Sequence, residues 1–154
     1  MEKFSTVVAS VASGTDKTLL NLFNPAATPT GRGGVYEILL GSKDAPASQA
    51  ANFFVGRTTA VGTEGSGLTP SNLDPGGPAG EYDSGLGVYS VEPTYTASKT
   101  ILNVPGLNQQ ATFRWTTIPE YAILAAATQN NGLGLKNSAS TSTQAHGATI
   151  LFTE

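Results

Sequence analysis

The sequence predicts an all-β domain: an antiparallel sandwich or barrel, jelly-roll-like, with long irregular loops. Two observations carry this prediction. Short apolar or Thr-rich runs recur between breaks made by Gly, Pro and Asn, and helical periodicity is nearly absent. With 154 residues, of which 39% are hydrophobic, the chain can form one packed domain over residues 1–154.

Four strands are expected in the first sixty residues, at 4–11, 18–23, 35–40 and 50–60. Asn24-Pro25 closes the second of them, because Pro supplies no ladder N–H. Gly56 is a plausible bulge in the fourth. The N-terminal run reads as the first strand and not as a signal peptide, since Ser5, Thr6 and Ser10 interrupt its apolar stretch.

Residues 62–87 form a long Gly/Pro-rich segment that we expect to be an irregular loop. Loops of this length in compact domains are generally functional or disordered. Polar, low-complexity residues 136–147 predict a second exposed loop.

The second half of the chain predicts further strands at 87–92 and 94–104, and a last one at 147–152. Pro105-Gly106 fits a type II turn, so 99–118 is expected to be a β-hairpin whose second strand turns Phe113 and Trp115 toward the core. The apolar run 121–127 fits either a strand or a short helix.

Composition excludes several functions. Only 12% of residues are charged and the net charge is −3, without the clustered cations that nucleic-acid binding needs. There is no Cys and a single His, so thiolate chemistry and sites needing two imidazoles are absent. No apolar run approaches the ~20 residues of a membrane span.

No enzymatic motif appears, and no cofactor or metal is expected. Asp74, Glu81 and Asp83 could supply oxygen ligands to calcium, but their spacing matches no EF-hand or nonapeptide pattern, and a solvated acidic loop is the preferred interpretation. Nothing marks any pair of carboxylates as the two acids of a glycoside hydrolase. His146 is expected to be exposed and idle.

Contact residues are sought instead among tyrosines, arginines and the long loop. Tyr residues are enriched at interfaces, and arginines can anchor them through carboxylate pairing, although ion pairs within the subunit are equally plausible. Tyr82, Tyr89, Tyr95 and Tyr121 are expected to be exposed. The candidate contact residues are Leu68, Pro70, Leu73, Asp74, Pro75, Tyr82, Tyr89, Arg32 and Arg57.

Three stretches resemble small structural proteins of tailed bacteriophages, in particular the cement, or decoration, proteins of the head. These are NLFNPAATPTGRGGVYEILLGS (21–42), FVGRTTAVGTEGSGLTPSNLDP (54–75) and NQQATFRWTTIPEYAILAAATQNNGLGL (108–135). The resemblance implies a non-enzymatic virion protein, made in the host cytoplasm, that binds the major capsid protein on the outer capsid surface. It also implies a homo-oligomer, with a trimer favoured over a dimer, and no nucleic acid, membrane or cofactor.

Two alternatives remain open: a carbohydrate-binding β-sandwich, and a tail or head-completion protein. If the long loop makes the capsid contact, removing residues 66–84 should leave the fold intact and abolish that contact.

Overall fold

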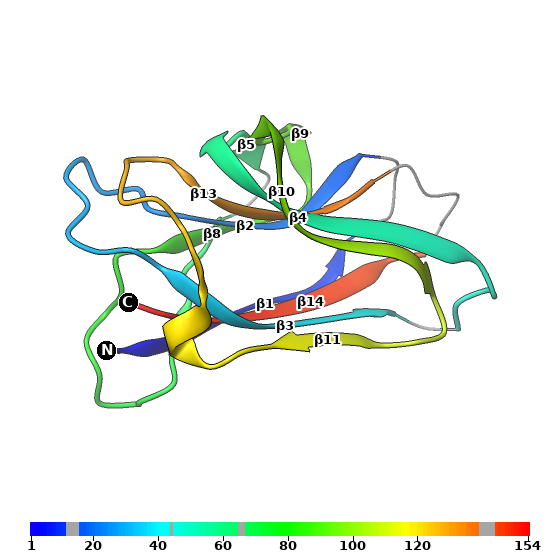
Figure 1. Cartoon of the computed structure of the whole chain (residues 1–154), viewed down its shortest axis with the longest axis horizontal. Coiled ribbons are helices and arrows are strands. Elements are labelled where there is room, and N and C mark those ends of the chain that lie inside the picture. The colour runs from blue at the N-terminus through cyan, green and yellow to red at the C-terminus, as the bar shows by residue number, and fades with distance from the viewer. Residues whose placement is uncertain (12–15, 44, 65–66, 139–143) are drawn as a thin grey trace.

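The computed structural model describes residues 1–11, 16–43, 45–64, 67–138 and 144–154. Two six-stranded antiparallel sheets pack face to face as a sandwich and do not close into a barrel (Figure 1). The predicted all-β sandwich is therefore confirmed. A small two-stranded sheet of β5 (Thr63–Glu64) and β9 (Tyr89–Val91) lies outside one of the layers.

The first layer, sheet A, follows the order β11-β3-β14-β1-β7, and β12 also pairs with β3. Its strands are β11 (Phe113–Thr116), β3 (Gly34–Ser42), β14 (His146–Thr153), β1 (Lys3–Val11), β7 (Ser71–Asn72) and β12 (Ile123–Leu124).

The second layer, sheet B, follows the order β10-β4-β13-β2-β8-β6. Its strands are β10 (Thr94–Asn108), β4 (Ala50–Ala60), β13 (Gly132–Asn137), β2 (Lys17–Phe23), β8 (Asp83–Leu86) and β6 (Gly67–Leu68).

The core lies between the inner faces of the two sheets. Alternation along β1 turns Phe4, Thr6 and Val8 inward, as the two-residue period of a strand requires. Phe4 stacks on Phe152 with ring centroids 5.4 Å apart, and the ring of Tyr82, the residue just before β8, lies 6.0 Å from that of Phe152. Aromatic side chains from both layers therefore close the centre of the sandwich.

The predicted 99–118 hairpin is wrong. β10 pairs with β4 in sheet B, and β11 pairs with β3 in sheet A, so the chain crosses between layers after β10. β11 extends sheet A beside β3, and from there its Phe113 and Trp115 side chains pack against the core. Gly106 has the predicted positive φ of 63°, but it forms a bulge within a continuing strand, and its N–H donates to Asn52 Oδ1 at 2.7 Å.

The irregular loop predicted at 62–87 is also wrong in part, because four short strands lie in it. Ser84 on β8 and Tyr82 just before it are buried, and Ser84 Oγ lies 2.5 Å from the hydroxyl of Thr6 on β1. The C-terminal Glu154 side chain accepts hydrogen bonds from the N–H groups of Glu81 and Tyr82, at 2.8 and 3.0 Å. Much of this segment therefore belongs to the folded body.

The apolar 121–127 run, expected to be a strand or a short helix, contains the end of a 3₁₀ turn, η1 (Pro119–Tyr121), and the two-residue strand β12. The polar 136–147 segment, expected to be an exposed loop, is shorter than predicted. β13 extends to Asn137 and β14 begins at His146, so both ends of the polar 136–147 segment lie in strands, while residues 139–143 lie outside the described residues.

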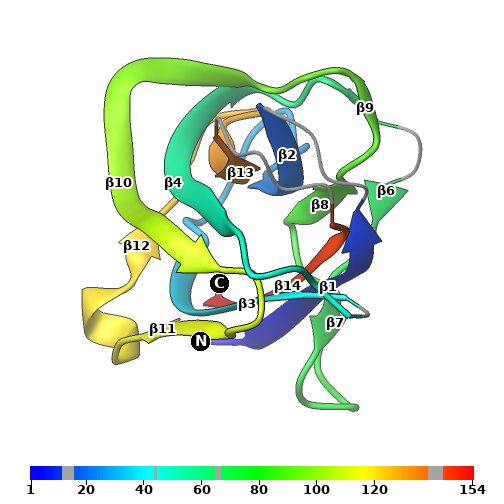
Figure 2. The ribbon, with the colours of Figure 1, turned by 90° about the vertical axis from the view of Figure 1, so that its right-hand side faces the viewer.

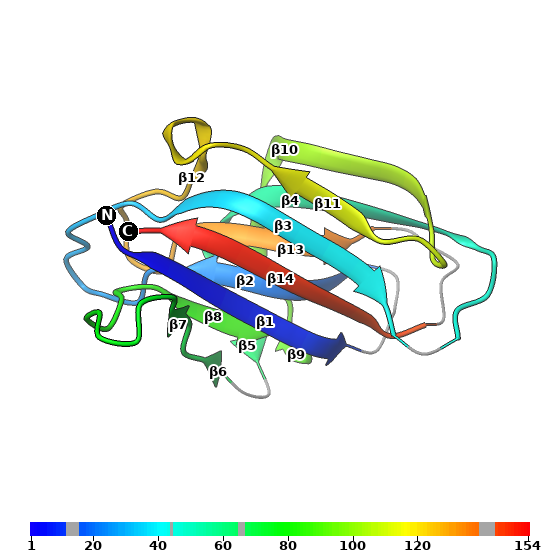
Figure 3. The same ribbon diagram turned by 90° about the horizontal axis from the view of Figure 1, so that it is seen from below.

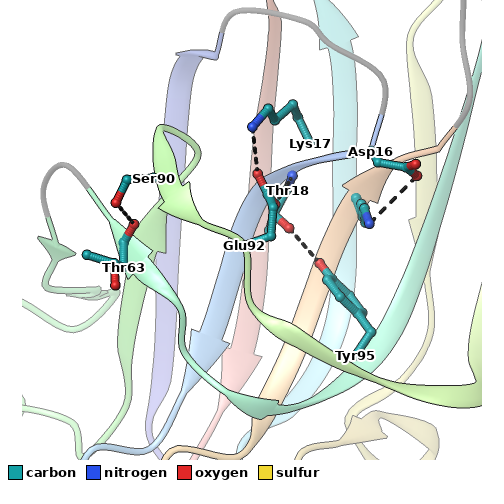
Figure 4. A network of polar contacts seen from close by, with 8 residues as sticks. Asp16, Lys17, Thr18, Thr63, Ser90, Glu92 and Tyr95 are labelled. Atoms are coloured by element: carbon teal, nitrogen blue, oxygen red, sulfur yellow. Dashed lines mark hydrogen bonds and ion pairs between the residues drawn. The ribbon is translucent and has the colours of Figure 1, made fainter.

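A polar network holds the small β5–β9 sheet to the start of β2 (Figure 4). The carboxylate of Glu92 accepts a hydrogen bond from the Thr18 N–H at 2.9 Å and forms an ion pair with Lys17 at 3.3 Å. The hydroxyls of Thr18 and Tyr95 lie 3.0 Å apart. Burial raises the pKa of Tyr95, so this phenol stays protonated and holds its place in the network.

His146, expected to be exposed, is 2% exposed at the start of β14. Its ring meets the edge of Phe53 with centroids 5.0 Å apart, and neither ring nitrogen has a hydrogen-bond partner among the described residues. Desolvation lowers the pKa of this imidazole below its ordinary 6.5, because burial disfavours the charged form.

This burial predicts a pH dependence of stability. The unfolded chain takes up a proton at His146 near its ordinary pKa while the folded chain does not, so the free energy of unfolding should decrease as the pH falls below about 6.5. Urea unfolding at pH 7.5 and 5.5 measures this effect. His146→Phe should lose the decrease across that window, and an equal decrease in both proteins would show that another group titrates.

Candidate interaction surfaces

One face of sheet A is open to solvent, and we call it the outer face. The registers place two rows of four side chains on it, across β1, β14, β3 and β11. These rows are Val7, Thr149, Leu39 and Arg114, and Ser5, Leu151, Glu37 and Thr116. Figure 3 looks onto this face, which no other element crosses.

The two rows of the outer face carry little net charge, and Lys3 is exposed on the same face beyond Ser5. Arg114 and Glu37 neutralise one another in an ion pair of 2.9 Å, and the remaining members of the two rows are aliphatic or hydroxyl-bearing. Val7 and Leu39 are 49% and 38% exposed, which is high for large aliphatic side chains in the middle of a sheet.

A shallow depression of about 390 Å³ lies at one end of the outer face. Gly41 on β3 and Gly147 on β14 are directly paired there, so the two central strands present backbone instead of side chains. Thr112, Thr149 and Leu39 line its walls.

A second surface lies where the two sheets part, between β10 and β12 on one side of the sandwich (Figure 2). A pocket of about 650 Å³ opens there, with Ile101, Ile123 and alanines 122, 125 and 126 along its walls. Arg32 and Arg57 also line it, and Arg57 Nη1 donates to the carbonyl of Leu124 at 2.5 Å. We call this the edge pocket.

The electrostatics of the edge pocket favour an anion. Across the described part of the chain, neither Arg32 nor Arg57 forms an ion pair with a carboxylate. Leu124, which lines the pocket, is 42% exposed, and Ile118 and Tyr121, a few residues before it in the chain, are 56% and 75% exposed. The pocket is suited to a carboxylate carried by an apolar segment.

A third feature is a rigid turn that follows β7, here called the acidic turn: Leu73, Asp74 and Pro75. All three are exposed. The Asp74 N–H donates to Asn72 Oδ1 at 2.9 Å, Asp74 Oδ1 accepts from the Gly76 N–H at 3.0 Å, and Asn72 Nδ2 donates to the Pro78 carbonyl at 2.9 Å. These three hydrogen bonds hold the turn in its conformation.

The structure separates the predicted contact residues into groups. Arg32 and Arg57 come together at the edge pocket, and Leu73, Asp74 and Pro75 share the acidic turn on another element. Leu68 is half-buried in β6 and Pro70 is buried, so both support the fold more than they offer a surface.

Two of the predicted contacts are corrected. Tyr82 and Tyr89 are 2% and 5% exposed, because β8 and the β9 region fold back onto the sandwich and carry these rings inside. Tyr82 packs against Gly33, where an added Cβ would lie 3.0 Å from the ring. Tyr95 is also half-buried, so Tyr121 alone of the four tyrosines is largely exposed.

Sequence reasoning missed Val7, Leu39 and Ile118. Val7 and Val8 are adjacent, so apolar patterning alone does not say which of them faces the core. The inward placement of the polar Thr6, whose hydroxyl contacts Ser84, sets this register.

The structure offers little support for a metal site or a sugar-binding platform, two of the alternatives raised by the sequence. Among the described residues, no group of three or more His, Asp or Glu side chains gathers as a metal site would need. Glu81 of the acidic trio is engaged elsewhere: its carboxylate accepts from Asn24 and Thr30, and these bonds lower its pKa. A platform of coplanar exposed rings for sugars is not present, since Tyr121 is the one large aromatic residue exposed by more than a third in the described chain.

Comparison with known proteins adds no relative. No family model, curated protein or solved structure matches the chain. Within the described residues, no helix has the length and apolar character required to cross a bilayer.

Proposed function

We propose that this chain is a non-enzymatic virion structural protein that cements a phage head, binding the major capsid protein from outside through the outer face of sheet A. The observation that supports this most directly is the open, nearly uncharged outer face, with Val7 and Leu39 exposed at its centre. The resemblance of the chain to cement proteins supports the same assignment.

The size of the outer face favours binding in many copies. The five strands β11, β3, β14, β1 and β7 contain 4, 9, 8, 9 and 2 residues. At ~4.8 Å between strands and ~3.3 Å per residue, they give a footprint on the order of 500 Å². A standard stable interface buries about 800 Å² on each partner. One copy therefore binds weakly, and linked copies on a repeating head gain avidity.

The low charge of the outer face predicts a contact that depends on shape and apolar area. Salt screens exposed ion pairs but weakens apolar burial little. A cement protein that binds a head through such a face should therefore retain its affinity over a wide range of ionic strength.

Leu39→Lys tests the proposal. A buried charge and a lost apolar contact at the centre of the face should weaken binding to bare heads at least roughly tenfold, the scale of an interface hot spot. Co-sedimentation of the protein with heads built from the major capsid protein of the same genome measures the affinity.

Val88→Lys is the matched control, because Val88 is 70% exposed and lies outside the outer face, in the turn between β8 and β9. It should bind as the wild type does. Equal binding by Leu39→Lys and the wild type would remove the outer face from the capsid contact, and no binding by the wild type would overturn the cement proposal itself.

A further inference from the structure

We infer that copies of this protein join head to tail, with the acidic turn of one copy seated in the edge pocket of the next. This contact concerns the free protein and needs no head. It would supply the linked copies whose avidity the proposed function calls for.

The edge pocket defines the chemistry of its occupant. Two guanidinium groups without ion-pair partners in the described chain line a pocket whose other walls are aliphatic. An Arg side chain binds a carboxylate with a charge-assisted hydrogen bond, often through two N–H groups at once. The occupant should therefore present one carboxylate flanked by apolar groups.

The acidic turn has this composition. Asp74 is exposed between Leu73, which is 49% exposed, and Pro75. The N–H of Leu73 donates to the Lys3 carbonyl at 2.8 Å, which ties the turn to β1. Because the turn is already rigid, little conformational entropy is lost when it binds.

The two features lie on opposite edges of sheet A. β12 and β11 border β3 at one edge, and β7, which leads into the acidic turn, is the strand at the other (Figure 3). A contact between opposite edges cannot be the same patch on both copies, so it is heterologous and generates a ring or a filament. In a ring whose axis is perpendicular to the sheets, the outer faces of all copies point in the same direction. Docking on a head requires this orientation.

Disulfide trapping tests this contact cleanly, because the chain contains no Cys of its own. Pro75→Cys places a thiol beside Asp74, and Ala126→Cys places one on the pocket wall. Under mild oxidation neither variant alone should cross-link. An equimolar mixture of the two should give disulfide dimers with one copy of each, and the double variant should give trimers or longer chains.

Val88→Cys mixed with Ala126→Cys is the control and should not cross-link above background. Adding Asp74→Arg to Pro75→Cys should reduce the dimer yield at least roughly tenfold, since like charges then meet in the pocket.

Four outcomes would overturn the inference: no cross-links in the mixture, cross-links within a single variant alone, an equal yield with Val88→Cys, or a yield unaffected by Asp74→Arg. If the cysteine variants bind heads but do not cross-link, the head-to-tail contact is wrong and the proposed function stands. If Leu39→Lys no longer binds heads while the cysteine pair still cross-links, the result supports the outer face as the capsid contact and says nothing against the head-to-tail contact.

Discussion

Phe152→Ala is expected to lower the free energy of unfolding by about 3–5 kcal/mol, the range for a large aromatic side chain removed from a packed core. Phe152 is 0% exposed and packs against Phe4 on the neighbouring strand and Tyr82, which leads into β8 of the other sheet. Because a domain of this kind has only about 5–15 kcal/mol of stability, the variant should be marginal near body temperature.

Urea unfolding followed by Trp115 fluorescence measures this loss. Val88→Ala is the control, since Val88 is 70% exposed, and it should change the stability by no more than about 0.5 kcal/mol. A loss below about 1 kcal/mol for Phe152→Ala would mean that the two sheets do not close around this ring.

Deleting residues 66–84 is expected to abolish cooperative folding. The deletion removes Tyr82 from the core, the Ser84 hydroxyl that pairs with Thr6, and two of the residues through which β8 pairs with β2. The expectation drawn from the sequence, that the fold survives this deletion, is therefore reversed.

A triple replacement of Leu73, Asp74 and Pro75 by Ser is the matched comparison, because it alters the exposed turn and leaves β7 and β8 in place. It should retain a single cooperative unfolding transition in circular dichroism. A deletion variant with a native-like transition would show that β8 and Tyr82 are dispensable.

The strands were predictable where burial imposes a two-residue period. Ala148, Ile150 and Phe152 on β14 alternate with Thr149 and Thr153 in the sequence, and all three face the core. On β1 the adjacent Val7 and Val8 left the inward side undecided. The partner of each strand was harder to predict. Consecutive strands pair more often than not, yet β10 and β11 join different sheets because each completes a different inner face.

The candidate site was predictable in its residue types but not in its grouping. Arg32 and Arg57 are 25 residues apart and meet only because the entry to β3 and the middle of β4 border the same opening between the sheets. Tyr82 sits in a Gly- and Pro-rich stretch that reads as loop, and its burial depends on the space beside Gly33, which no local pattern reveals.

In the proposed function, contacts between copies and attachment to the head use surfaces of different charge. The edge pocket and the acidic turn carry opposite charges and sit on the rims, whereas the outer face is broad and nearly neutral. Contacts between charged groups weaken with salt, and apolar contacts do not. Assembly of copies and attachment to the head should thus respond differently to ionic strength.

The central claim is that the outer face of sheet A binds the outside of the head. A cryo-electron microscopy reconstruction of heads saturated with the protein tests it most directly. The predicted result is a sandwich-shaped density at the junctions between major capsid proteins, with the Val7 and Leu39 face toward the capsid. Density confined to the tail or its attachment site, or sheet A turned to solvent, would contradict it.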